Sequence, residues 1–138
     1  MDLQRFVAAQ DARETYDRAL AELHAGRKRS HWMWFVFPQL AGLGFSVTTR
    51  AFAIADLAEA RGYLEHDVLG PRLRECCRAL LAIEDRSAEQ VLGVIDAIKL
   101  RSSMTLFARA APDEVVFAEV LDRYYDGLED ERTVRLLA

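Results

Sequence analysis

The sequence predicts an all-α protein, a compact single-domain bundle of about six or seven helices over residues 1–138. Apolar residues recur along most of the chain with the three- and four-residue spacing of a helix face. Several helix starts carry a capping-box pattern, in which an N-cap residue is followed three positions later by Glu or Gln. No long stretch alternates apolar and polar residues as a half-buried strand does. A chain of 138 residues is also long enough for one domain with its own core.

The first predicted helix follows a capping box formed by Asp11 and Glu14. Its apolar face consists of Tyr16, Ala19, Leu20 and Leu23. Gly26 ends the helix, because glycine readily adopts the left-handed conformation that follows a helix end.

The next segment, residues 31–36, is either a short buried helix or a strand, because periodicity alone does not separate the two. Pro38 drives Phe37 toward an extended conformation, so any helix ends there. Residues 38–48 are then expected to form a loop.

Two longer helical segments follow this loop. The first covers about residues 49–66 and breaks near Asp56, which forms a second capping box with Glu59. The next opens at residues 67–71, and its buried face is expected to contain Leu69, Leu73, Cys76, Cys77, Leu80 and Leu81.

A third capping box, Ser87 with Gln90, opens a short helix. A longer helix over residues 94–109 comes next, and its apolar residues predict a heavily buried helix. These residues are Ile95, Ile98, Met104, Leu106 and Phe107.

Two more helices complete the chain. Residues 112–114, Pro-Asp-Glu, are expected to be the first turn of one helix, where proline is tolerated and acids are favourable. This helix ends at Asp126-Gly127, and Asp130 caps a last helix over residues 131–137.

The composition, 51% hydrophobic and 29% charged residues, is that of an ordinary globular protein. No apolar run approaches the roughly 20 residues that span a bilayer, and the N-terminus lacks a signal peptide pattern. Cys76 and Cys77 are adjacent in a helical pattern and poorly placed for a mutual disulfide, so we expect a reduced, cytoplasmic protein. The net charge of −4 argues against broad nucleic-acid binding.

Motifs for known cofactors and metals are absent from the sequence. There is no Walker loop, no Gly-x-Gly-x-x-Gly, no His-Glu-x-x-His and no Cys-x-x-Cys. The histidines, His24, His31 and His66, are too scattered to indicate a metal site. We therefore expect no cofactor and no metal.

Residues 30–46 form the most informative stretch, because they contain both tryptophans and three of the seven phenylalanines. A segment so rich in large rings is expected to be buried, yet its indole N–H and other polar groups need partners. The rings are either simple core or the wall of a pocket. We expect Trp34 to present a face on which a flat base or sugar stacks.

Three polar residues near these rings are candidate site residues. His31 is either a hydrogen-bonded structural histidine or an acid–base catalyst. Gln39 either satisfies local backbone or contacts a nucleobase through its amide. Arg29, in the basic triplet Arg27-Lys28-Arg29, is either a solvated helix end or a residue that holds a phosphate.

A second candidate group is Asp96-x-x-Lys99-x-x-Ser102-Ser103. On a helix, positions 96, 99 and 103 share a face and 102 lies beside 99. Asp96 and Lys99 are either an ion pair or a site in which Asp96 is catalytic and Lys99, Ser102 and Ser103 bind an anionic ligand. Asp130 is a further catalytic candidate, although turn and cap chemistry also explains it.

The chain resembles an uncharacterised bacterial family, domain-of-unknown-function family 1810. The likeness is carried by Ser-His-Trp-Met-Trp-Phe-Val-Phe-Pro-Gln-Leu-x-Gly-Leu-Gly-x-Ser over residues 30–46, with further matches at 63–73, 96–107 and 117–133. The resemblance implies a compact, mostly helical domain and no established activity. Some members carry a calpastatin label, but calpastatin is a disordered repeat inhibitor, and this chain has no repeats.

These observations lead to two functional hypotheses. The first is a binder of, or enzyme on, a small anionic ligand such as a nucleotide, an ADP-ribose-like compound or a sugar phosphate, in a pocket lined by Trp34 and Lys99. For an enzyme, the leading guess is an N-glycosidic hydrolase, because the order of Phe107, Asp126-Gly127 and a late aspartate is similar to small bacterial domains with that activity. The alternative is a protein–protein interaction module that uses residues 30–46.

Overall fold

The computed structural model describes residues 2–138, and the regular elements in this range are helices. They are α1 (Gln4–Asp11), a 3-10 turn (Ala12–Glu14), α2 (Thr15–His24), α3 (Met33–Val36), α4 (Val47–Ala51), α5 (Leu57–Glu65), α6 (Leu69–Ala82), α7 (Ala88–Leu92), α8 (Val94–Ala110), α9 (Val116–Tyr125) and α10 (Glu131–Leu137). The predicted all-α class is confirmed. The expected number of helices was too low, because α1 was not predicted and the segment over 49–66 forms two helices.

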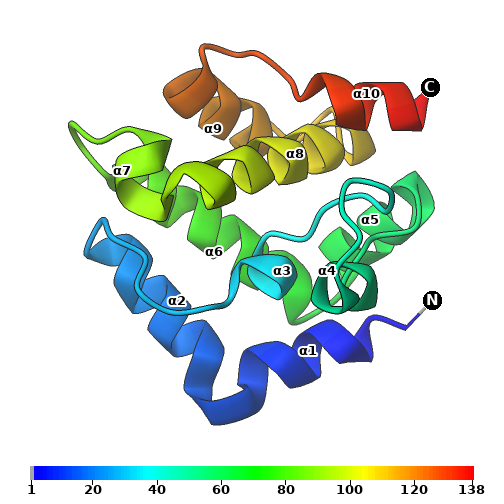
Figure 1. Ribbon diagram of the computed structural model, residues 1–138, viewed down its shortest axis with the longest axis horizontal. Coiled ribbons are helices and arrows are strands. Elements are labelled where there is room, and N and C mark those ends of the chain that lie inside the picture. Colours follow the sequence, from blue (N-terminus) through cyan, green and yellow to red (C-terminus); the bar gives the residue numbers. More distant parts are fainter. Residues whose placement is uncertain (1) are drawn as a thin grey trace.

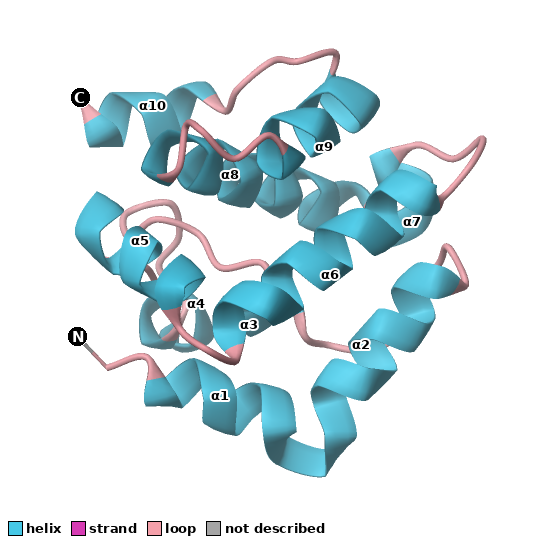
Figure 2. Cartoon of the chain, turned by 180° about the vertical axis from the view of Figure 1, so that it is seen from behind, coloured by secondary structure: helices cyan, strands magenta, loops and turns pink. Residues whose placement is uncertain are grey.

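Helix α8 runs through the middle of the molecule and contacts α5, α7, α9 and α10 (Figure 1). Helix α6 crosses below it and contacts α2, α5 and α9. The reverse view in Figure 2 shows α1 and α2 at the opposite edge of the molecule from α9 and α10. This arrangement places the short helix α3, which carries the aromatic stretch, between the N-terminal helices and α8.

Four of the largest buried side chains form an aromatic chain through the core. Phe6 contacts Tyr63 edge-on at 5.2 Å between ring centroids, and Tyr63 lies 5.4 Å from Phe107. Phe107 in turn lies 5.7 Å from Phe117. Tilted and edge-on contacts of this kind add to the stabilisation from burial itself. The aromatic chain joins α1, α5, α8 and α9 into one continuous hydrophobic cluster.

The predicted capping box at Asp11 and Glu14 is wrong. Asp11 is the last residue of α1, and its side chain caps nothing. Arg13 and Glu14 adopt left-handed backbone conformations, with φ of 53° and 57°, so the chain bends there and α2 begins at Thr15. Asp11 instead forms an ion pair with Arg72 of α6, at 2.8 Å. A tertiary partner therefore takes the carboxylate that the pattern assigned to a cap.

The other predicted helix starts are mostly confirmed. Asp56 accepts a hydrogen bond from the Glu59 N–H, Ser87 and Gln90 form a reciprocal capping box, and Asp130 accepts from the Thr133 N–H. The predicted first turn at residues 112–114 is wrong, because α9 begins only at Val116. Of residues 31–36, left open between helix and strand, Met33–Val36 form the short helix α3.

Two further expectations concern the surroundings of the chain. Among residues 2–138, no helix combines the length and the apolar character needed to cross a membrane. Cys76 and Cys77 are buried free thiols, and burial raises the pKa of the Cys76 thiol to about 12. These thiols are therefore protonated at neutral pH and poor nucleophiles.

Candidate functional site

A surface cavity of about 450 Å³ lies between the aromatic stretch and the first turn of α8. Its lining consists of Lys28, His31, Met33, Trp34, Leu92, Gly93, Val94, Ile95, Asp96 and Lys99. A second hollow of about 450 Å³, near the end of α10, is lined by apolar residues and Asp56, which is already the N-cap of α5. Of these two cavities among the described residues, the first alone combines basic, acidic and aromatic side chains, so it is the candidate site.

Glu22 of α2 holds the segment that forms one wall of this cavity. One of its carboxylate oxygens accepts hydrogen bonds from the Arg29 and Ser30 N–H groups and from the Trp32 indole N–H, at 2.8, 3.0 and 2.9 Å. The other oxygen accepts from the Ser30 hydroxyl. Burial opposes the charged form, but these hydrogen bonds outweigh it and lower the pKa of Glu22 to about 2.

The same segment is also fixed from the side of α7. Gly26 ends α2 with a φ of 76°, which reverses the chain. The Lys28 N–H then donates to the Val91 carbonyl at 2.8 Å. The segment from 28 to 34 is thus held by both Glu22 and α7, and it contributes Lys28, His31, Met33 and Trp34 to the lining of the cavity.

The two tryptophans occupy different environments. Trp32 is fully buried, and the Lys28 ammonium lies 5.2 Å from its ring centroid. Trp34 is half-buried and lines the cavity, with the Lys99 ammonium 4.9 Å from its ring centroid. The proximity of Trp34 and Lys99 that the sequence predicted is therefore observed, and each lysine makes a cation–π contact with one indole.

Asp96 connects the two lysines. Its Oδ2 lies 3.0 Å from Lys28 Nζ, and its Oδ1 lies 3.9 Å from Lys99 Nζ. The three side chains are largely buried, with 10% of Lys28, 19% of Asp96 and 21% of Lys99 exposed. Two lysines and one aspartate give these three side chains one net positive formal charge.

The remaining predicted residues of the aromatic stretch lie at or beyond the edge of the cavity. His31 lines it and is exposed. Gln39 lies in a much smaller hollow that also touches Trp34, and its carbonyl accepts a hydrogen bond from the Ile54 N–H. The side chain of Arg29 is exposed and does not line the cavity; its neighbour Lys28 does.

Ser102, Ser103 and Asp130 are not brought to the cavity. The Ser102 hydroxyl is buried and donates to the Ile98 carbonyl at 3.2 Å. Ser103 is fully buried in α8, and its hydroxyl has no hydrogen-bond partner among the described residues. Asp130 caps α10 through the Thr133 N–H and hydroxyl. The structure thus assembles Asp96, Lys99, Trp34 and His31 and leaves these three elsewhere.

The expectation of a heavily buried α8 is wrong for its first two turns. Val94, Ile95 and Ile98 are 68%, 71% and 58% exposed. Val94 and Ile95 line the cavity at the surface, whereas residues 102–107 of the same helix are buried. Helical periodicity identifies a face, but it does not say where along a helix the covering elements end.

Lys28 and Glu22 are the residues that the sequence reasoning missed. One signal for Lys28 was present: Lys28 and Lys99 are the two lysines of a chain whose other basic residues, among 18 in total, are arginines. Lysine offers a compact point charge, which an arginine with its planar fork does not reproduce. No local signal singles out Glu22, because it looks like an ordinary acidic residue of a helix.

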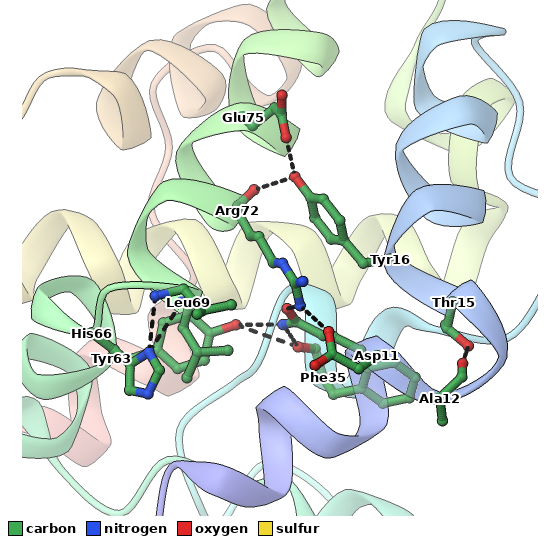
Figure 3. Close-up of polar contacts among 12 residues, drawn as sticks. Asp11, Ala12, Thr15, Tyr16, Phe35, Tyr63, His66, Leu69, Arg72 and Glu75 are labelled. Atoms are coloured by element: carbon green, nitrogen blue, oxygen red, sulfur yellow. Dashed lines mark hydrogen bonds and ion pairs between the residues drawn. The ribbon is translucent and has the colours of Figure 1, made fainter.

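A separate polar cluster braces the helices on the other side of the aromatic stretch (Figure 3). The buried Gln10 side chain donates to the Phe35 carbonyl and the Tyr63 hydroxyl, at 2.7 and 3.1 Å, and accepts from Arg72. The Tyr16 hydroxyl lies between the Arg72 carbonyl and the Glu75 carboxylate. No cavity opens at this cluster among those described, so we assign it a structural role that fixes the end of α3.

Comparison with known proteins finds one matching family and a similar crystal structure. The family described as protein of unknown function, DUF1810, matches residues 1–137. The chain is also similar to the conserved hypothetical protein Rv1873 from Mycobacterium tuberculosis. The two sequences are 53% identical, and the comparison with its crystal structure gives a TM-score of 0.96. That similarity covers 99% of this chain and 96% of the other. No curated protein matches the chain.

Proposed function

We propose that this protein, which belongs to the DUF1810 family of proteins of unknown function, binds a small anionic ligand in the cavity between Trp34 and Lys99. The observation that carries this proposal is the gathering of both lysines of the chain, each against a tryptophan, in one concave site. Convergent polar groups in an otherwise apolar cavity are typical of ligand sites.

The first turn of α8 supports an anion at the same place. Gly93, Val94, Ile95 and Asp96 line the cavity, and no side chain caps the start of this helix. The first N–H groups of a helix have no partner within it and carry partial positive charge. Together with Lys28 and Lys99, they favour a negative group on the ligand.

The volume and the ring set the size and shape of the ligand. A cavity of about 450 Å³ is at the small end of typical ligand pockets. The half-buried Trp34 offers a surface for a flat ring. Nucleotides, ADP-ribose-like compounds, sugar phosphates and aromatic acids are therefore the compounds to screen first.

If the protein is an enzyme, the reaction proposed for this cavity is hydrolysis of an N-glycosidic bond in the bound ligand. It would depend on Asp96 and His31, because Asp130 lies away from the cavity and is engaged as a helix cap. Asp96 is already paired with two ammonium groups of the protein itself, so its carboxylate oxygens are engaged before any ligand binds. Binding is therefore the part of the proposal that we favour.

A thermal-shift screen followed by calorimetric titration tests the binding proposal. A ligand found in this way should lose affinity in Trp34→Leu and in Lys99→Met. The matched controls are Phe45→Leu and Arg50→Met, which change an exposed ring and an exposed cation outside the cavity. Equal affinity in the site variants, or no binding by any screened anion, would contradict the proposal.

One observation favours the alternative, a protein interaction surface. The exposed apolar side chains of Val94, Ile95 and Ile98 lie together on the first turns of α8. Exposed apolar clusters often mark interfaces. Ile98→Ser separates the two functions, because Ile98 does not line the cavity. Ligand affinity should be unchanged in this variant, whereas an interface function predicts loss of a specific partner and no effect of Lys99→Met on that partner.

A further inference from the structure

The charges of the cavity indicate which anionic group the ligand carries, provided that the cavity binds an anion as proposed above. Lys28 is committed to Asp96 by a contact of 3.0 Å. Lys99 lies 3.9 Å from the other carboxylate oxygen, which is too long for a hydrogen bond. Lys99 therefore keeps its three N–H donors for a group on the ligand, whereas Lys28 already uses one of its three on Asp96.

An anionic group bound to Lys99 also lies close to the Asp96 carboxylate. The repulsion between them grows with the charge on the ligand. A carboxylate brings one negative charge, which balances the single net positive formal charge of Lys28, Lys99 and Asp96 together. A phosphate monoester brings nearly two at neutral pH, so its second charge faces Asp96 without compensation.

The walls of the cavity favour an apolar body on the ligand. Met33, Leu92, Val94 and Ile95 line the cavity together with Trp34. The hydroxyl groups of a ribose or a sugar would find few hydrogen-bond partners against these side chains, and burying them unpaired is costly. An aromatic ring loses nothing there and gains contact with the indole.

We propose that the cavity selects a monoanionic aromatic carboxylate and that Asp96 is the residue that discriminates against phosphate dianions. The ligand ring packs against Trp34 and the apolar wall, and its carboxylate binds Lys99. Asp96 thus sets specificity through its charge, and Lys28 holds it in place.

Three ligands that share one ring system test this selectivity: 2-naphthoate, 2-naphthamide and 2-naphthyl phosphate, titrated calorimetrically into the full chain. The carboxylate is expected to bind about tenfold more tightly than either the neutral amide or the phosphate ester. Asp96→Asn should reverse the order of carboxylate and phosphate ester. The control Asp113→Asn, at an exposed position in the loop before α9, should keep the wild-type order.

The outcomes separate this inference from the proposed function. Equal or tighter binding of the phosphate ester to the wild type, or an unchanged order in Asp96→Asn, overturns the selectivity and leaves the anion site standing. Failure of every anion in this set and in the broader screen overturns the proposed function as well. If Asp96→Asn does not fold, the order of the three ligand affinities in the wild type tests the selectivity, together with Lys99→Met. This variant should bind 2-naphthoate about tenfold more weakly and 2-naphthamide with unchanged affinity.

Discussion

Replacing Glu22 with glutamine tests whether one buried carboxylate holds the wall of the proposed site. Three N–H donors converge on a single oxygen of Glu22, and the hydroxyl of Ser30 binds the other. Glutamine keeps the size and one acceptor oxygen, so the variant should fold. It loses the negative charge that makes these hydrogen bonds strong.

The size of the effect follows from the pKa of Glu22, which lies at about 2 instead of the ordinary 4.5. This difference of about 2.5 pKa units corresponds to about 3 kcal/mol of stability. Because the pKa is lower in the folded state, the unfolded state binds more protons between these values. The contribution is therefore complete above about pH 5 and is lost as the pH falls toward about 2.

The assay is urea unfolding of the wild type and Glu22→Gln at several pH values between about 3 and 7. The wild type should be more stable by about 3 kcal/mol near pH 7, and more than half of this difference should disappear by about pH 3. Glu119→Gln, at an exposed position on α9, is the matched control and should show no such convergence. A stability difference that is absent at pH 7, or that stays constant with pH, would refute the assignment.

Three further predictions follow from single contacts. Lys99→Met should lower the unfolding free energy by less than about 1 kcal/mol in urea denaturation, because Lys28 still pairs with Asp96. A large loss of stability in Lys99→Met that is restored in the double variant with Asp96→Asn would instead identify a structural ion pair. Asp130→Ala should cost about 1 kcal/mol by removing the cap of α10, and retention of full stability would contradict that role. Gly26→Ala should also cost about 1 kcal/mol, because alanine at a φ of 76° is strained, and an unchanged melting temperature would count against this.

Local signals in the sequence were sufficient for the helical class and for most helix starts. The capping box at Ser87 and Gln90 and the cap at Asp130 depend on atoms within three residues of each other, so the pattern contains the whole interaction. The same kind of pattern at Asp11 and Glu14 failed, because Arg72 of α6 takes the Asp11 carboxylate instead. A sequence pattern offers a side chain its local partner and does not reveal a stronger competitor elsewhere in the fold.

The candidate site was predictable only in part for the same reason. Crowded rings around Trp34 and a lysine in an apolar helix indicated that both needed partners, and the structure brings them together. The packing of α2, α7 and α8 decides the pairing of Lys28 with Asp96 and the hydrogen bonds by which Glu22 holds residues 29–32. By itself the sequence determined most of the helical segments and indicated that the rings around Trp34 and the Lys99 side chain required partners. Only the tertiary structure decided which charges meet in the cavity, because ion pairs and burial are set by distance in space and not by spacing along the chain.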